Sequence, residues 1–354
     1  MISFTPLFRR GLTALAVTAA GATAMGVLAP TSASAKEMFE GKTVKVYIGY
    51  GAGGGYDRYG RQVARHIGKH LAGKPNVVAF NMPGAGGRKA TAWLSKIAPK
   101  DGSNLLGTMP GSLVEPILGD PKRVKYNPLK FGYIGSASGF TTMCLVRHEH
   151  PAKTFKDMMK TQVIMGGDQI GSTTHDQANM FRNLVGANIK LVKGYSGTKN
   201  LVLAIQQKEI DGFCGYAWAS LMSRAPHLIK NKIVRLVVQF GLDPHPAATA
   251  AGIPPVWGFV KDKKKIAALK LLASTQTFGR PYIVPANVPK ARLASLRAAF
   301  DATMKDPAFK KDMAKSRLSI QPTSGAKVQK LIENIYHSDA ATQKLARWAI
   351  SKSE

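Results

Sequence analysis

The residues best suited to chemistry in this sequence lie in a glycine-rich stretch that runs from Gly49 to Gly55 and is followed by Asp57. Its glycines can adopt backbone angles that are closed to other residues. Asp57 is typical of the first turn of a helix, where a carboxylate is stabilised. A bare loop that leads into a helix N-terminus presents free N–H groups to an anion. The stretch therefore predicts an anion site, with phosphate and dinucleotide equally open.

The elements that must hold this loop are a strand before it and a helix after it. Val44, Val46 and Ile48 alternate as in a short buried strand. The apolar positions after the loop recur every four residues, which predicts a helix; they are Tyr59, Val63, Ile67 and Leu71.

The same order of strand, polar glycine-containing loop and helix recurs three more times. The later loops are residues 81–87, 166–174 and 194–197. Strands that alternate with helices predict an α/β fold with mixed, mostly parallel sheets. If the four helix N-termini converge on one cleft, their backbone N–H groups can bind carboxylates without a lysine or arginine in contact.

The first 35 residues have the layout of a secretory signal peptide. Arg9 and Arg10 precede an apolar run from Leu12 to Leu28, and residues 33–35 read Ala-Ser-Ala, a small-residue cleavage site. A membrane anchor fits less well, because Thr and Gly interrupt the run. We expect cleavage after Ala35 and export to the periplasm.

The remaining chain is long enough for two lobes. We predict one lobe from residues 36–135 plus 241–354 and the other from residues 136–240. The segment that contains Pro116, Pro121 and Pro128 is rich in turn residues, which predicts an irregular surface connection. Two helices, at residues 289–304 and 327–350, are expected near the end of the chain.

The net charge of +30, from 50 Lys and Arg against 20 Asp and Glu, favours anionic partners. Nucleic acid is not predicted, because the basic residues are spread along the chain and no nucleic-acid-binding motif accompanies them.

Three other kinds of site have weaker support. Gly49, Gly51 and Gly54 match a dinucleotide fingerprint, but the acid expected about twenty residues later is missing. His66 with His70, and His148 with His150, would need a third ligand to bind a metal, so we expect neither metal nor cofactor. Ser172 and His175 share a loop, but the nucleophile elbow of a hydrolase is absent. A periplasmic hydrolase is therefore a secondary hypothesis, and no catalytic residue is assigned.

Cys144 and Cys214 are the two cysteines of the chain. An even pair in an oxidising compartment permits one disulfide, but two buried free thiols satisfy the sequence as well. We predict that the two residues lie close together in the second lobe.

Several motifs resemble those of the tripartite tricarboxylate transporter receptors, the Bug family of periplasmic solute-binding proteins. The resemblance covers essentially all of the chain after residue 35 and rests on these segments: Gly-Gly-Gly-Tyr-Asp at 53–57, Asn-Met-Pro-Gly-Ala-Gly-Gly at 81–87, Ala-Pro-Lys-Asp-Gly at 98–102, Gly-Tyr-Ser-Gly at 194–197, Glu-Ile-Asp-Gly at 209–212 and Gly-Arg-Pro at 279–281.

The resemblance implies a two-lobed, Venus-flytrap receptor of the second periplasmic-binding class. Such a receptor is not an enzyme and delivers a small organic carboxylate, such as a di- or tricarboxylate or an aromatic acid, to a large and a small membrane subunit. We expect a monomer. A receptor that reports its ligand to a signalling system would use the same cleft.

The resemblance also assigns ligand-binding residues. They are Tyr50, Ala52, Gly53, Gly54, Asp57, Asn81, Gly84, Ala85, Gly86, Gly171, Ser172, Thr173, Thr174 and Tyr195. Asp57 can instead cap its helix and order the loop. The chain departs from the family at Tyr50-Gly51-Ala52 and at Cys214 to Trp218. Tyr50, Tyr195 and Trp218 are therefore candidates to line an apolar or aromatic-accepting pocket, and Trp218 is equally suited to the core.

Overall fold

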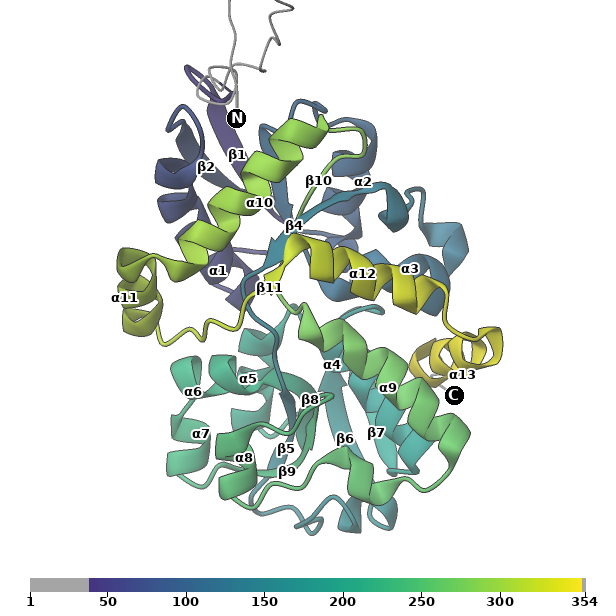
Figure 1. Cartoon of the computed structure of the whole chain (residues 1–354). Coiled ribbons are helices and arrows are strands. Elements are labelled where there is room, and N and C mark those ends of the chain that lie inside the picture. The colour runs from purple at the N-terminus through teal and green to yellow at the C-terminus, as the bar shows by residue number, and fades with distance from the viewer. Residues whose placement is uncertain (1–37, 352–354) are drawn as a thin grey trace, which may run out of the picture.

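The computed structural model describes residues 38–351, so the predicted signal peptide lies outside the described residues. Two sheets, one of six strands and one of five, form the centres of two lobes (Figure 1). Within the described part of the chain, no helix is long and apolar enough to cross a membrane.

The first sheet has the strand order β11-β4-β10-β3-β1-β2. Its strands are β1 (Thr43–Ile48), β2 (Asn76–Asn81), β3 (Asn104–Gly107), β4 (Gly132–Ser136), β10 (Pro281–Val284) and β11 (Thr323–Ser324). Strand β1 pairs in parallel with both β2 and β3, whereas β10 runs antiparallel between β3 and β4. The carboxyl ends of β1 and β2 therefore lie at the same edge of the sheet.

The second sheet has the order β7-β6-β8-β5-β9. Its strands are β5 (Thr142–Arg147), β6 (Val163–Gly167), β7 (Ile189–Lys193), β8 (Gly212–Ala217) and β9 (Val234–Phe240). Strand β6 is parallel to β7 and β8, and β5 is antiparallel to its neighbours β8 and β9. Both sheets are thus mixed with most strands in one direction, which confirms the predicted α/β class.

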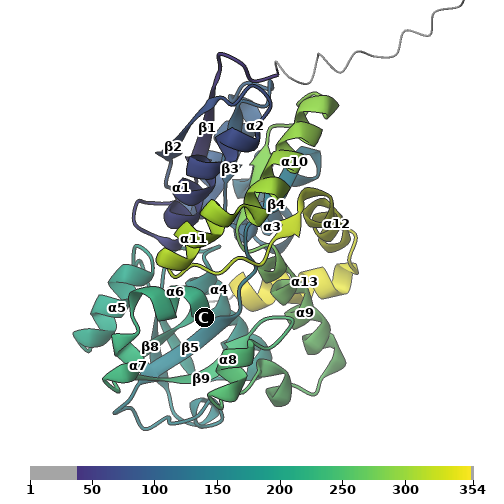
Figure 2. The same ribbon diagram turned by 60° about the vertical axis from the view of Figure 1, so that its left-hand side comes forward.

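Helices cover both sheets (Figures 1 and 2). They are α1 (Gly55–Ile67), α2 (Arg88–Lys96), α3 (Pro110–Leu118), α4 (Thr173–Met180), α5 (Thr198–Gln206), α6 (Trp218–Arg224), α7 (His227–Lys230), α8 (Pro246–Ala250), α9 (Lys263–Thr277), α10 (Lys290–Lys305), α11 (Pro307–Lys315), α12 (Gly325–Tyr336) and α13 (Ala340–Ser351). Shorter helical turns occur at Gly68–His70, Ala85–Gly87, Pro121–Arg123, Pro128–Lys130, Asp157–Met159, Phe181–Val185 and Val256–Phe259.

The alternating residues of β1 and one face of α1 form the core behind the glycine loop. Val44, Val46 and Ile48 are completely buried, as are Val63 and Ile67 of α1. Complete burial of such a side chain contributes about 1.5–3 kcal/mol to folding. This packing fixes the strand and the helix, so the loop between them is held at both ends.

Helix α13 connects the two lobes. In both views it lies at their boundary, beside α9 (Figures 1 and 2). Arg347 Nε donates to the carbonyl of Ile117 at 2.8 Å, at the end of α3 in the first lobe. Two residues further along α13, the carbonyl of Ala349 accepts a hydrogen bond at 2.8 Å from Asn183 Nδ2 in the second lobe. The last helix therefore contacts both lobes on the side away from the glycine loop.

The prediction of an irregular connection around Pro116 is wrong, because this residue lies inside helix α3. Leu113 and Leu118 of the helix are buried in the core. Proline lacks an N–H, which would leave the carbonyl of Ser112 one turn earlier without a donor. The hydroxyl of Tyr126 donates to that carbonyl at 2.7 Å, and this contact explains why the helix tolerates proline.

The end of the chain forms four helices, α10 to α13, where two were expected. Asp306 separates α10 from α11, and its carboxylate accepts a hydrogen bond from the N–H of Ala308 at 2.9 Å. Asp339 likewise accepts from the N–H of Thr342 at 2.8 Å, where α13 begins. Both interruptions are N-caps, which end one helical pattern and start the next.

Candidate functional site

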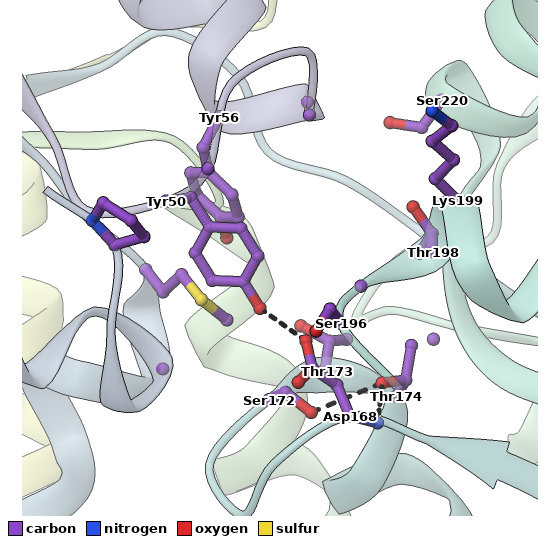
Figure 3. A pocket seen from close by; sticks show the side chains of 18 of the residues that line it. Tyr50, Tyr56, Asp168, Ser172, Thr173, Thr174, Ser196, Thr198, Lys199 and Ser220 are labelled. Atoms are coloured by element: carbon purple, nitrogen blue, oxygen red, sulfur yellow. Dashed lines mark hydrogen bonds between the residues drawn. The ribbon is translucent and has the colours of Figure 1, made fainter. Parts of the chain in front are cut away.

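A cavity of about 590 Å³ lies between the two lobes (Figure 3). The loops after β1 and β2 line it from the first lobe, and the loops after β6, β7 and β8 line it from the second. Of the predicted ligand-binding residues, the following line this cavity: Tyr50, Ala52, Gly53, Gly54, Gly84, Ala85, Gly86, Ser172, Thr173 and Thr174.

Asp57 and Asn81 hold the first glycine loop from behind and do not line the cavity. One carboxylate oxygen of Asp57 accepts a hydrogen bond from the N–H of Gly53 at 2.9 Å. The other accepts from Asn81 Nδ2 at 2.8 Å and from Arg61 Nε at 2.9 Å. Asn81 Nδ2 also donates to the carbonyl of Tyr50 at 2.9 Å. These contacts fix the shape of the loop. They support the alternative prediction for Asp57, in which its carboxylate orders the loop.

The loop after β2 reaches the cavity through an unusual backbone. Gly84 and Gly86 have φ values of 139° and 61°, and Ala85 between them has a φ of 49°. Such left-handed conformations favour glycine. The loop can therefore bring its backbone close to a ligand where side chains would be in the way.

In the second lobe, the loop after β6 is held by its own hydroxyl groups. Ser172 is the N-cap of α4, and its Oγ accepts a hydrogen bond from the N–H of His175 at 3.3 Å. Thr174 Oγ1 accepts from the N–H of Asp168 at 3.0 Å. Ser172, Thr173 and Thr174 line the cavity at the start of α4, where unpaired N–H groups favour an anion.

A hydrogen bond closes the cleft between the two loops. Tyr50 Oη donates to Asp168 Oδ2 at 2.9 Å, and Figure 3 shows this bond reaching from one lobe to the other. Burial and the Asp168 carboxylate raise the pKa of Tyr50 well above its usual range, which keeps the phenol protonated as a donor. Arg88 Nη1 also crosses the cleft and donates to the carbonyl of Ile170 at 3.3 Å. The structure is therefore a closed form.

Gly171, Tyr195 and Trp218 do not line the cavity. Gly171 lies beside Glu115 and Arg88 of the first lobe, and its φ is 86°. The hydroxyl of Tyr195 donates to Glu209 at 3.4 Å, and the ring of Trp218 lies 5.1 Å from that of His245. The geometry of the cavity does not support a role in ligand binding for these three residues, so this role stays a prediction.

Sequence reasoning missed the cationic and aromatic lining of the cavity. The missed residues include Tyr56, Met109, Phe140, Lys199, Ser220, Arg224 and Arg280. Two of them lie in segments that carried the family resemblance, Tyr56 in residues 53–57 and Arg280 in residues 279–281. Arg280 is buried, yet nothing in the sequence distinguishes it from the many arginines on the surface.

The geometry does not assemble the hydrolase or metal sites. The imidazole of His175 is completely buried and contacts Asp176 at 2.9 Å and Asn179 at 3.2 Å, not the hydroxyl of Ser172. His66 and His70 each contact an aspartate at 3.0 Å. Among residues 38–351, no cluster of three or more His, Cys, Asp or Glu side chains could hold a metal ion.

Cys144 and Cys214 form a disulfide in the structure. Both are buried, on the adjacent antiparallel strands β5 and β8 of the second lobe. The bond therefore joins neighbouring strands of one sheet and does not cross the cleft.

Two α/β lobes with a polar, glycine-lined cavity closed between them define the class of two-lobed solute-binding proteins. The chain belongs to the tripartite tricarboxylate transporter family receptors, whose family model matches residues 59–345.

Two curated relatives match parts of the chain. A UPF0065 protein encoded in the gbd 5′ region of Cupriavidus necator is 32% identical over 152 residues, which cover 42% of this chain and 44% of the relative. A UPF0065 protein of Bordetella pertussis is 26% identical over 193 residues, or 53% of this chain and 58% of that protein. The chain thus spans about half the length of the curated relatives it matches.

Solved structures share the fold over nearly their whole length. MatC of Rhodopseudomonas palustris with bound malate is 18% identical, with a TM-score of 0.65, covering 86% of this chain and 98% of MatC. The periplasmic binding protein BugD is 20% identical, with a TM-score of 0.66 and coverages of 87% and 97%. Rpa4515 of R. palustris with adipate is 17% identical, with a TM-score of 0.65, covering 87% of this chain and 97% of Rpa4515. These likenesses establish the two-lobed fold.

Proposed function

We propose that this protein is a periplasmic receptor that captures a small organic carboxylate between its two lobes. The observation that carries the proposal is the convergence of glycine- and hydroxyl-rich loops from both sheets on one cavity between the lobes. Backbone N–H groups at the starts of α1 and α4 would bind the carboxylate. The lobes that close on it are built on the sheet of β1–β4, β10 and β11 and on the sheet of β5–β9. The boundary predicted at residue 241 is too early, because Ala248 and Ile253 lie in the core of the second lobe and the ring of Phe259 packs on that of Phe155.

The chemical class of ligand follows from the lining. The cavity has cationic side chains from Lys199, Arg224 and Arg280, whereas its acidic lining residue, Asp168, already accepts a hydrogen bond from Tyr50. Malate and adipate, which the structures of MatC and Rpa4515 contain, are acids of this kind. A di- or tricarboxylate or an aromatic acid is therefore the proposed cargo.

The proposed role is delivery, not catalysis. Family membership supports handover to the large and small membrane subunits of a tripartite tricarboxylate transporter, in the periplasm after cleavage at Ala35. The receptor would act as a monomer. His175, whose imidazole contacts Asp176 and Asn179, offers no base to Ser172, which weighs against the hydrolase. A sensing receptor would use the same cavity and differ only in its membrane partner.

A thermal-shift screen of the mature chain against an organic-acid panel tests the proposal. The panel contains succinate, malate, adipate, citrate and benzoate. At least one acid should raise the melting temperature increasingly with concentration, as mass action requires for a ligand that binds the folded state. A folded protein that none of these acids stabilises would contradict the proposal. Turnover of an ester substrate that disappears in Ser172→Ala would favour the hydrolase.

A further inference from the structure

Arg280 stands immediately before β10, and three aromatic rings hold its side chain. Its guanidinium carbon lies 4.3 Å from the ring centre of Tyr56, 4.9 Å from that of Phe140 and 5.2 Å from that of Tyr59. The residue is only 7% exposed, and the part that is accessible lines the cavity. The rings fix the position of the guanidinium and exclude water from its faces.

The charge of Arg280 has no acidic partner within the described residues. Its Nη1 donates to the carbonyl of Gly279 at 3.1 Å, but its Nε is buried and has no hydrogen-bond partner there. Asp168, the acidic residue of the cavity lining, accepts instead from Tyr50 Oη at 2.9 Å and from the N–H of Gln169 at 2.7 Å. A buried cation without a counter-charge is strongly disfavoured, because it has lost its hydration.

A second positive feature meets Arg280 at the same place. A Cβ added at Gly55 would lie 3.3 Å from Arg280 Nη2 and 3.4 Å from Ser220 Oγ. Gly55 is the first residue of the 13-residue helix α1, whose N-terminal end carries partial positive charge. Guanidinium and helix end repel each other unless an anion lies between them. Ser220 places a hydroxyl of the second lobe beside the same point.

We infer that Arg280 supplies the counter-charge for one carboxylate of the bound acid. The carboxylate lies between the guanidinium and the start of α1, and Ser220 contacts it from the second lobe. Arg280 therefore determines specificity, because it selects an acid over a neutral molecule of the same shape. This inference rests on the proposed function and adds to it the residue that distinguishes charged from neutral ligands.

Calorimetry with matched pairs of acid and amide tests the inference. The pairs are succinate and succinamide, malate and malamide, adipate and adipamide, and benzoate and benzamide. The wild-type protein should prefer the acid of at least one pair. In Arg280→Met, the affinity for that acid should fall by about 10- to 100-fold, because a charge-assisted hydrogen bond is lost. The preference over its amide should almost disappear.

Arg65→Met is the matched control, since it removes one positive charge from the exposed side of α1. The side chain of Arg65 is 62% exposed and lies outside the cavity lining. Its affinity for the acid should stay within about twofold of wild type, because an exposed charge is screened by water and salt. An equal loss in both variants would show that net charge, not Arg280, attracts the acid, and would overturn the inference.

The melting temperature without ligand separates ligand binding from a structural role. Replacing an unpaired buried charge by an apolar side chain of similar length is neutral or stabilising, so Arg280→Met should melt at or above the wild-type temperature. Arg280→Lys should recover part of the acid preference. A lower melting temperature with an unchanged acid preference would overturn the inference and leave the proposed function standing. Failure of the wild type to bind any acid would overturn both.

Discussion

Tyr50 and Asp168 are 118 positions apart in the sequence, yet the phenol of the first donates to the carboxylate of the second at 2.9 Å. One residue follows β1 in the first lobe, and the other follows β6 in the second. The bond joins the two lobes within the lining of the cavity. It is a direct stabilising contact of the closed form, because separation of the lobes must break it.

Tyr50→Phe should shift the protein towards an open form and weaken binding of the acid chosen by the thermal-shift screen. A hydrogen bond to a charged acceptor contributes about 1.5–3 kcal/mol, so calorimetry should show a loss of roughly tenfold or more. Tyr47→Phe is the control, because its ring stacks on Phe80 within the first lobe. Equal affinities of Tyr50→Phe and wild type would show that the bond does not stabilise the closed form.

Gly111→Ala should hinder closure without unfolding either lobe. A Cβ at Gly111 in α3 would lie 2.6 Å from the carbonyl oxygen of Gly171 in the second lobe, closer than packed atoms approach. Within α3 itself alanine is the better helix former. Small-angle scattering should show a larger radius of gyration than for Gly258→Ala, whose added Cβ would meet nothing within 4 Å. Identical scattering of the two variants would contradict this account of closure.

Asp306 should make the first lobe sensitive to acid. Lys69 and His70 hold the pKa of its carboxyl well below the usual range, and the N–H of Ala308 adds to this effect. A carboxyl with a lowered pKa stabilises the fold above its unfolded value of about 3.9, and that stability is lost as the pH falls below it. Urea midpoints of Asp306→Asn should therefore be lower than wild type at pH 7 and converge with it towards pH 2. A constant difference across this range would contradict the assignment.

The disulfide should be present in protein isolated from an oxidising compartment. It links strands 70 positions apart in sequence, so its reduction releases a long loop of the unfolded chain. Removal of such a bond costs about 2–5 kcal/mol. Thiol titration of the unfolded, unreduced protein should find no free thiol, and Cys144→Ser with Cys214→Ser should lower the urea midpoint. Two reactive thiols would instead support the alternative of unbonded cysteines.

Local patterns predicted most of the strands and the loops that follow them. Val44, Val46 and Ile48 alternate, the glycines after them interrupt the strand pattern, and apolar residues then recur every four positions, so β1, its loop and α1 could be predicted directly. The helix around Pro116 could not be predicted, because its tolerance for proline depends on the hydroxyl of Tyr126 at the carbonyl of Ser112. That contact exists only in the folded chain.

The parts of the site that are formed by backbone could be predicted from the sequence. The parts that are formed by side chains could not. The loops that hold Gly53 and Ser172 lie where the pattern of strand, loop and helix put them, and both residues line the cavity. The role of Arg280 depends on Tyr56 and Tyr59, which helix α1 brings to it, and on Phe140, which comes from the segment between β4 and β5. Burial of one arginine among many is a tertiary property that spacing does not encode.

A crystal structure of the protein grown with the acid chosen by the thermal-shift screen tests the central claim most directly. We predict that one carboxylate lies between the loop of Gly53 and Gly54 and the start of α4, or beside Arg280 at the start of α1, inside the closed cavity. An acid bound on the outer surface, or an empty cavity at saturating acid concentration, would contradict the account.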